Sequence, residues 1–343
     1  MKKMSFVIII TLIFLYSATT LCGTGIGKYA SEFMAIGVGG RALGLGGAYT
    51  AIANDVTAGY WNPAGLSKIN YPQLSLMHSE QFGSLVNYDY AAAAFPVGSN
   101  SSVGVSVIRL GVDAIPDTRG ALIDEDGDGI FDDNERLDKS KISYFNTADW
   151  AVYFTYSKKH SNSLSYGANI KLIRRDMSVG SATGIGFDVG IQFSPYENFF
   201  VGANLQDATT TFLAWNTGTN ELISPTLKLG SAYLIEALGG KFIPVFDVDI
   251  RFENRRYASN VNLGPVSFDM HTGLEFDLKN IAALRIGYSD IGTANFGAGI
   301  HLPKFDIDYT FATSKLTDER FDNTHRVSIT FTFESDQFAR RTE

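Results

Sequence analysis

Residues 37–70 read GVGGRALGLGGAYTAIANDVTAGYWNPAGLSKIN. The stretch is too rich in glycine and alanine to build a hydrophobic core of its own, yet it carries specific residues such as Asp55, Trp61 and Asn62. Glycine allows turns and close backbone contacts at no steric cost. We therefore expect this segment to fold as a wedge inside a larger structure, which the rest of the chain has to supply.

The same stretch contains a weak match to a dinucleotide-binding fingerprint. Gly37, Gly39 and Ala42 have the spacing G-x-G-x-x-A. That fingerprint also needs a preceding buried strand, a following helix and an acidic residue about 20 positions on. Residues 33–36 are barely a strand, and Asp55 lies in an Asn-Asp turn. The pattern therefore does not indicate a nucleotide site.

The first 22 residues have the features of a secretory signal peptide. Lys2 and Lys3 form a charged region, residues 6–16 an apolar one, and small residues precede a cleavage point before Gly23. A lipid anchor on Cys22, the single cysteine, is a poor alternative because a leucine stands where a small residue is expected. Cleavage would leave an exported chain without disulfides, which its own fold must hold together.

Composition supports an exported β-protein. Aromatic residues make up 13% of the chain, with 25 Phe, 16 Tyr and 34 Gly, as in β-structures with aromatic girdles. Loss of the signal peptide changes the formal charge from −8 to −10, because 26 basic residues then stand against 36 acidic ones. An acidic protein of this kind has no general attraction for nucleic acid.

From residue 73 onward the sequence becomes a series of short segments of alternating polarity. In the last segment Val327, Ile329 and Phe331 share one face, and the residues between them are polar. Successive strand side chains point to opposite faces, so each segment has one apolar and one polar side. Fourteen strands are predicted, at 73–81, 87–97, 102–110, 147–160, 164–174, 184–194, 199–206, 226–234, 242–252, 266–278, 281–288, 293–302, 305–312 and 325–333.

Alternation alone does not separate a soluble β-sandwich from an outer-membrane barrel. Connection lengths favour the barrel, since one set of alternate connections is mostly long and the other uniformly short, as external loops and periplasmic turns are. An even strand count places both ends of the barrel on the periplasmic side, where the wedge can enter. We predict an all-β transmembrane antiparallel β-barrel of about 14 strands with an N-terminal hatch in its lumen. The predicted parts are a signal peptide (1–22), a hatch (23–71), a barrel (72–333) with a loop at 111–146, and a C-terminal tail (334–343).

Residues 40–69 resemble the N-terminal segment of PorV/PorQ-type outer-membrane proteins, relatives of the FadL long-chain fatty acid transporters. The matching portions are the glycine-rich run 44–49, the turn 53–55 that ends at Asp55, and the motif Asn62, Pro63, Ala64 and Gly65. The resemblance implies a hatch in a fourteen-stranded barrel, surrounded by outer-membrane lipid. It also implies a non-enzymatic accessory or shuttle component of type IX-like secretion, with a translocon or exported proteins as partners.

Two alternatives to the secretion role stay open. One is a FadL-like channel for a small hydrophobic molecule, which needs an apolar pocket and a wall opening for lateral release. The polar faces of the predicted strands weigh against it. The other is a soluble calcium-binding β-protein, which would be found in the periplasm.

The longest predicted loop contains a calcium-like motif. Residues 124–135 fit the EF-hand loop D-x-D-x-D-G-x-x-x-x-x-E over its full length. So many carboxylates within a dozen residues repel one another unless a cation lies among them. A solvated acidic loop is the alternative, but the turn glycine and the distal glutamate favour Ca²⁺ in a structural role. The predicted ligands are Asp124, Asp126, Asp128, the carbonyl of Ile130, Asp132 and a bidentate Glu135.

Other chemistry-bearing residues indicate no catalytic site. The chain has no G-x-S-x-G elbow, and its five histidines lie on different segments without metal-ligand spacing. Trp215 lies in a predicted external loop, as an interfacial anchor or part of a partner surface. A set of lumen-facing charges of mixed sign is expected to form a ladder of ion pairs, namely Asp247, Asp249, Arg251, Asp269, Glu275, Arg285, Asp306 and Asp308.

The calcium motif makes a direct prediction. The purified full-length protein should bind Ca²⁺ with a dissociation constant of about 0.1–1 mM, the range of extracellular calcium modules. Glu135→Gln removes the bidentate ligand and should weaken binding about tenfold or more, whereas Glu125→Gln loses the same charge at a non-ligating position and should bind nearly as well. Calorimetric titration measures both, and equal weakening by the two variants would show a diffuse acidic loop.

Overall fold

The computed structural model describes residues 25–26, 32–81, 85–123, 135–178, 180–252, 259–289, 292–314 and 323–340. The predicted signal peptide lies outside these residues, as do all predicted calcium ligands except Glu135. No helix among the described residues is long and apolar enough to cross a bilayer.

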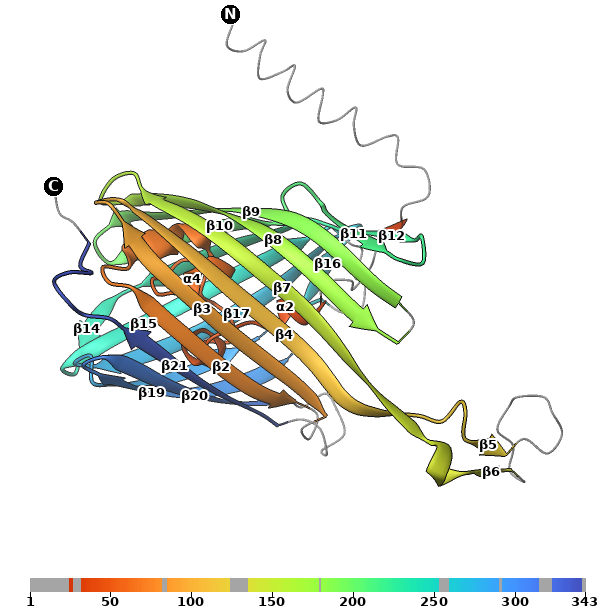
Figure 1. Cartoon of the computed structure of the whole chain (residues 1–343). Coiled ribbons are helices and arrows are strands. Elements are labelled where there is room, and N and C mark those ends of the chain that lie inside the picture. The colour runs from red at the N-terminus through yellow and green to blue at the C-terminus, as the bar shows by residue number, and fades with distance from the viewer. Residues whose placement is uncertain are drawn as a thin grey trace, which may run out of the picture.

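Fourteen antiparallel strands close into a barrel, which confirms the predicted fold (Figure 1). Each strand pairs with the next along the chain, and the last pairs back onto the first through eight register partners from Gln73↔Thr332 to Glu80↔His325. The strands are β2 (Gln73–Gln81), β3 (Val86–Val97), β4 (Ser101–Asp117), β7 (Ser143–Lys159), β8 (Leu164–Met177), β9 (Gly180–Tyr196), β10 (Phe199–Gln206), β13 (Thr226–Tyr233), β15 (Gly240–Arg251), β17 (Val266–Leu278), β18 (Ala282–Tyr288), β19 (Thr293–Leu302), β20 (Phe305–Ser314) and β21 (Thr324–Thr332).

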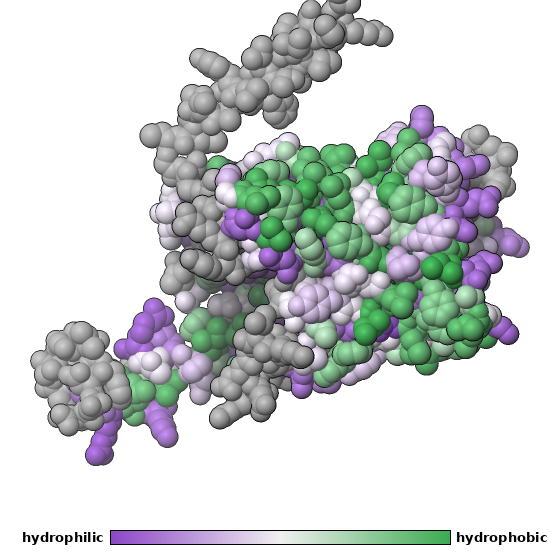
Figure 2. Space-filling model, turned by 180° about the vertical axis from the view of Figure 1, so that it is seen from behind, coloured by the Kyte–Doolittle hydropathy of each residue, from purple (hydrophilic) through white to green (hydrophobic). Residues whose placement is uncertain are grey.

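The alternation of the sequence becomes an inside and an outside. Along β9, Phe187, Val189 and Ile191 are exposed, whereas Asp188 and Gln192 between and beside them are buried in the lumen. Apolar side chains cover much of the outer wall (Figure 2). In a sandwich these apolar side chains would be buried between two sheets. The structure therefore excludes the sandwich alternative.

One pair of strands continues far beyond the ring. β4 and β7 stay paired out to Asp117↔Ser143, across a bulge between Val112 and Ile115, so much of the expected loop 111–146 is a two-stranded ribbon. At the bulge Ala114 has a positive φ of 55°, and its N–H donates to Asn146 Oδ1 at 2.9 Å. The ribbon projects from one end of the barrel, called here the ribbon end, and the opposite end is the turn end (Figure 1).

Smaller elements extend the ribbon and the barrel wall. β5 (Leu122–Ile123) pairs with β6 (Arg136–Leu137) in the ribbon, followed by a 3-10 helix at Lys139–Lys141. β14 (Ile235–Ala237) and β16 (Val261–Leu263) pair with β15 and β17. β11 (Thr211–Trp215) pairs with β9 and with β12 (Asn220–Ile223), so Trp215 belongs to a strand instead of an irregular loop.

The N-terminal segment fills the lumen (Figure 1). Its short helices are α2 (Glu32–Ala35), α3 (Gly40–Gly44), α4 (Ala58–Trp61) and a 3-10 helix (Pro63–Lys68). We expected the chain to enter from the periplasmic side, but β1 (Gly25–Ile26) pairs in parallel with β12 beside the ribbon end of β9. The hatch therefore runs from the ribbon end to the turn end, where β2 begins.

Glycines of the wall leave room for the hatch backbone. A Cβ atom on Gly202 would lie 2.4 Å from the carbonyl oxygen of Thr50, and one on Gly287 would lie 2.2 Å from the nitrogen of Gly46. Real Cβ atoms do not approach other atoms so closely, so any other residue would push the hatch away. Five wall glycines lie this close to the hatch backbone, and Gly190 lies as close to the side chains of Asn62 and Pro63. The six together, called here the glycine belt, are Gly167, Gly190, Gly202, Gly230, Gly273 and Gly287.

The glycine belt predicts a position-dependent effect of a single methyl group. Gly202→Ala should destabilise the barrel by about 1–3 kcal/mol, the usual result of overpacking. Gly120→Ala is the matched control, because nothing lies within 4 Å of its added Cβ atom. Denaturant unfolding of the detergent-purified protein measures both variants. Equal stability of the two would contradict the close contact between wall and hatch.

Candidate functional site

The hatch backbone is hydrogen-bonded by side chains of the wall. Asp247 Oδ2 accepts the N–H groups of Tyr49 and Thr50 at 3.0 and 2.8 Å. Gln192 Nε2 donates to the carbonyl oxygens of Thr50 and Ala53 at 3.1 and 3.0 Å. An irregular segment buried in a lumen needs such partners because its own backbone forms few regular hydrogen bonds. Polar residues of the wall thus hold the hatch in place.

Asn62 connects two parts of the hatch to the wall. Its Nδ2 donates to Thr50 O at 2.9 Å and to Ile191 O at 3.1 Å, and its Oδ1 accepts Ala64 N–H at 3.2 Å. The last contact caps the 3-10 helix that starts at Pro63. The predicted hatch residue Asn62 therefore lies at a junction and is fully buried.

The rest of the hatch motif packs against backbone. A Cβ atom on the wall residue Gly167 would lie 2.5 Å from the carbonyl carbon of Pro63 and 2.8 Å from Ala64 N. A Cβ atom on Gly65 would lie 2.1 Å from Ala53 O. These positions need their small or rigid residues because two backbones touch there. The motif is thus a packing motif, with no chemistry of its own.

Asp55 and Arg41 organise the centre of the hatch. Asp55 accepts Thr57 N–H at 2.8 Å and the Tyr49 hydroxyl at 2.8 Å. Arg41 donates to the same Tyr49 oxygen at 3.2 Å and forms an ion pair with Glu275 of β17 at 2.8 Å. A chain of polar contacts therefore runs from the hatch turn at Asp55 to the wall.

Buried ion pairs line the lumen. Arg285 bonds Glu275 at 2.6 Å and Asp308 at 2.5 Å, and Lys171 pairs with Asp188 at 2.8 Å and Asp207 at 2.6 Å. Asp247 is an exception among the lumen-facing charges that we expected to form ion pairs. It accepts hatch N–H groups and has no ion pair among the described residues. Charges paired this way stabilise one arrangement of the wall strands, because an unpaired buried charge is costly.

The histidines serve separate local contacts. His78 Nδ1 lies 2.7 Å from Asp89, His271 Nδ1 lies 2.8 Å from Gly46 O, and His301 Nδ1 lies 2.8 Å from Asp306. His325 contacts the Tyr309 hydroxyl at 2.6 Å, and His160 packs near the Tyr166 ring. Within the described ranges, no three His, Cys, Asp or Glu side chains gather as a metal site.

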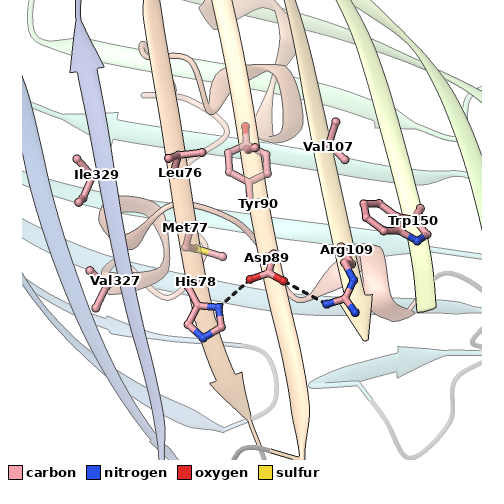
Figure 3. Close-up of a pocket in the computed structure, with 11 residues that line it drawn as sticks. Leu76, Met77, His78, Asp89, Tyr90, Val107, Arg109, Trp150, Val327 and Ile329 are labelled. Atoms are coloured by element: carbon pink, nitrogen blue, oxygen red, sulfur yellow. Dashed lines mark hydrogen bonds and ion pairs between the residues drawn. The ribbon is translucent and has the colours of Figure 1, made fainter. Parts of the chain in front are cut away.

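An apolar groove opens on the outer wall over β21, β2, β3, β4 and β7 (Figure 3). Its volume is about 450 Å³. Small side chains create it, because β3 carries four alanines in succession at 91–94 and only Ala91 covers the middle of the groove. The apolar lining consists mainly of Leu76, Val107, Val327 and Ile329.

One end of the groove is polar. His78 and Arg109 both contact Asp89, at 2.7 and 3.3 Å, and the guanidinium of Arg109 lies 5.8 Å from the Trp150 ring centroid (Figure 3). The cluster lies near the ribbon end, since β2 ends at Gln81. Charged and tryptophan side chains on the outside of a membrane protein are typical of the water interface. The apolar part of the groove therefore faces the acyl region.

The C-terminal tail closes the turn end of the barrel. The Arg340 guanidinium donates to Ile69 O at 2.7 Å, Ser67 O at 3.0 Å, Ser101 O at 2.8 Å and Ser102 Oγ at 2.7 Å. Burial lowers the pKa of Arg340 from its ordinary value. The expected simple tail is thus a latch on the end of the hatch, and nothing in its local sequence signals this contact.

Only one predicted calcium ligand is described. Glu135 is 8% exposed and directly precedes β6 in the ribbon, and it takes part in an interaction with another residue. The ligands Asp124, Asp126, Asp128, Ile130 and Asp132 lie outside the described residues. Calcium binding therefore stays a prediction.

The sequence of the chain is similar to an uncharacterised protein family. The profile of a family described as "Uncharacterised protein family (UPF0164)" matches residues 17–193. A UPF0164 protein from Treponema pallidum (strain Nichols) is 27% identical over 157 residues, which are 45% of this chain. The match spans 35% of that relative's length.

Solved structures similar to this barrel are channels and transporters by their titles. The CymD monoaromatic hydrocarbon channel superposes with a TM-score of 0.60 at 13% identity, over 88% of this chain and 98% of that one. The Ralstonia pickettii toluene transporter TbuX gives 0.58 at 12% identity, over 87% and 99%. A Pseudomonas aeruginosa FadL homologue gives 0.54 at 13%, over 86% and 97%. At such identities the likeness shows a FadL-like barrel fold, and it does not extend to PorV or PorQ in particular.

The ion pair between Arg41 of the hatch and Glu275 of the wall should help to hold the hatch in place. Glu275→Gln keeps the shape of the side chain but leaves Arg41 without its carboxylate, and breaking a buried pair typically costs about 3–5 kcal/mol. We expect faster amide hydrogen exchange in residues 36–50, measured by mass spectrometry. Arg174→Gln, at an exposed pair with Asp176, is the control and should leave this exchange unchanged. Unaltered exchange in the Glu275 variant would show that other contacts suffice.

Proposed function

The chain belongs to the uncharacterised protein family UPF0164, and we propose that it is a non-enzymatic outer-membrane channel for small hydrophobic molecules. The barrel fold is shared with proteins whose titles describe hydrocarbon channels and toluene transport. Since low identity limits that likeness to the fold, the proposal rests on an observation in this chain. That observation is the apolar groove on the outer wall beside the hatch.

The groove lies where the wall is thin and the hatch is close. Two of its lining residues, Met77 and Tyr90, have side chains on the lumen side, whereas Ala91 faces outward. The hatch touches the wall at the same place, because Gly39 N–H donates to Met77 Sδ at 3.1 Å. A molecule leaving the lumen sideways here would pass from the seam between hatch and wall directly to the lipid acyl chains.

The size and chemistry of the groove suit a small apolar ligand. A volume of about 450 Å³ lies within the range of about 300–1,000 Å³ that small-molecule sites occupy. Its aliphatic lining offers burial of apolar surface, worth about 25 cal/mol for each Å². The inward faces of the predicted strands are mostly polar, which is why the sequence weighed against a channel. The structure supplies the apolar surface on the outside of the wall.

Passage requires part of the hatch to move. The pairing of β2 with β3 is unbroken from Gln73↔Ala94 to Gln81↔Val86, so this seam has no ready-made hole and the two strands would have to separate locally as well. The hatch turn beside it contains Gly37 and Gly39 at positive φ values of 90° and 79°. Such a turn bends easily about its glycines. We infer that this turn, and not the whole hatch, gives way during passage.

The secretion role implied by the hatch resemblance remains a prediction. The channels that share this fold favour transport over secretion. A stable complex with exported proteins or a translocon, recovered from membranes, would reverse that preference. In either role we propose that Ca²⁺ stiffens the tip of the ribbon, because the calcium motif joins the paired strands β5 and β6.

Filling the groove should block transport. Ala91→Phe places an aromatic ring in the middle of the groove and should lower uptake of radiolabelled toluene about tenfold by cells that express the protein, provided the groove is the exit. Ala298→Phe introduces the same ring on the outer face of β19, which the strand β20 separates from β21 at the edge of the groove, and should transport normally. Uptake that is equal in the two variants would refute the groove as the exit, and uptake no higher than in cells without the protein would refute the proposed channel.

A further inference from the structure

The inner face of the same wall carries polar groups that have no hydrogen-bond partner among the residues that the structure describes. They are Ser79 Oγ, Gln81 Nε2, Tyr88 OH, and Nε and Nη1 of Arg326. The residues are neighbours, because Ser79 is the register partner of both Tyr88 on β3 and Arg326 on β21. Ser79 and Tyr88 are fully buried from solvent, so their side chains lie on the lumen side. We call these four residues the donor cluster.

Arg326 differs from the other cations of the lumen. Arg41, Lys171 and Arg285 each contact at least one carboxylate within 3 Å. Arg326 has no ion pair within the described part of the chain, and the residue that faces it across Ser79 is Tyr88 instead of an acid. A largely buried guanidinium without an anion is unfavourable unless a ligand supplies the anion.

The donor cluster lies on the ribbon-end side of the hatch. The hatch meets this part of the wall at Gly40, whose N–H donates to Ser328 Oγ at 2.9 Å and whose carbonyl accepts the Thr310 hydroxyl at 2.6 Å. Thr310 is the register partner of Arg326. On β21, Arg326 lies nearer to the ribbon end than Ser328 does. Arg326 remains partly exposed. A molecule entering from the ribbon end would therefore meet Arg326 where the hatch begins to close the lumen.

We propose that the donor cluster binds the carboxylate of a small organic acid. All four side chains can donate hydrogen bonds, and a guanidinium matches the two oxygens of a carboxylate. The proposal rests on the channel function and adds a substrate class to it, since an acid with an apolar body would have its charged group held in the lumen and its apolar part beside the thin wall.

Because the donors are unpaired, their removal should affect stability and ligand binding differently. In a structural role, loss of a side chain weakens the protein. Here each donor lacks a partner within the described part of the protein, and an unsatisfied buried group is destabilising. Tyr88→Phe and Ser79→Ala should therefore leave the melting temperature of the empty protein unchanged or raise it. The same variants should weaken binding of the acid.

Binding of benzoate to the detergent-purified full-length protein tests the proposal by calorimetric titration. Arg326→Gln should weaken binding at least tenfold, and Tyr88→Phe about threefold to tenfold, following the usual strengths of charged and neutral hydrogen bonds. Arg174→Gln, at an exposed ion pair, is the matched control and should bind as the wild type does. If Arg326→Gln does not fold, Tyr88→Phe and Ser79→Ala carry the test.

The outcomes separate this inference from the channel itself. Absence of benzoate binding, or binding unaffected by these substitutions, would overturn the donor cluster as a site even if toluene uptake still depends on the groove. Arg326-dependent binding of inorganic phosphate as tight as that of benzoate would overturn the organic acid as the ligand. Arg326-dependent benzoate binding by a protein that takes up no toluene would support the site and refute the proposed channel.

Discussion

The structure depends on contact between the hatch backbone and the wall backbone inside a closed ring. A closed ring leaves no sheet edge, so the wall is complete in itself, and the hatch has to find its partners on inward-facing side chains. Glycine makes the approach possible at places such as Gly190 and Gly202, and side chains such as Gln192 and Asp247 then satisfy the hatch N–H and carbonyl groups. Close approach and hydrogen bonding therefore depend on each other. Together they explain why the inner face of the wall combines glycines with polar side chains and why the hatch fills the lumen.

The close contacts at wall glycines are not evenly distributed around the ring. The glycine belt lies on β8, β9, β10, β13, β17 and β18. The strands β20, β21, β2 and β3 contain no glycine at all, and there the small residue at the contact belongs to the hatch, as Gly40. On the first arc a moving hatch would lose many contacts at once. On the second arc it would lose a few hydrogen bonds, among them the one between Gly39 N–H and Met77 Sδ.

Much of the fold could be predicted because its signal is local. The two-residue period of side-chain direction reveals each strand without knowledge of its partners, and the hatch motif reveals a packed segment by its glycines and Asn62. The ribbon was missed because the predicted strands end at residue 110 and begin again at residue 147, whereas β4 and β7 continue their pairing across a bulge between Val112 and Ile115. The alanines at 91–94 indicate a thin part of the wall. Whether they leave a groove on the outer or the inner face depends on the side chains of the neighbouring strands, which the local sequence does not reveal. The Arg340 latch and the isolation of Arg326 depend on residues more than 200 positions away, and no local pattern reports such contacts.

The apolar groove and the donor cluster are two faces of one patch of wall. Successive residues alternate between them, with His78 outside and Ser79 inside, Asp89 outside and Tyr88 inside, Val327 outside and Arg326 inside. Because the alternation is fixed by the pleat, a change in register of β2 by one residue would exchange the two faces entirely. The patch also lies on the arc that carries none of the belt glycines. A wall that is thin, apolar outside and rich in unpaired donors inside is suited to passing a molecule, and the opposite arc, with its close backbone contacts, is suited to keeping the hatch in place.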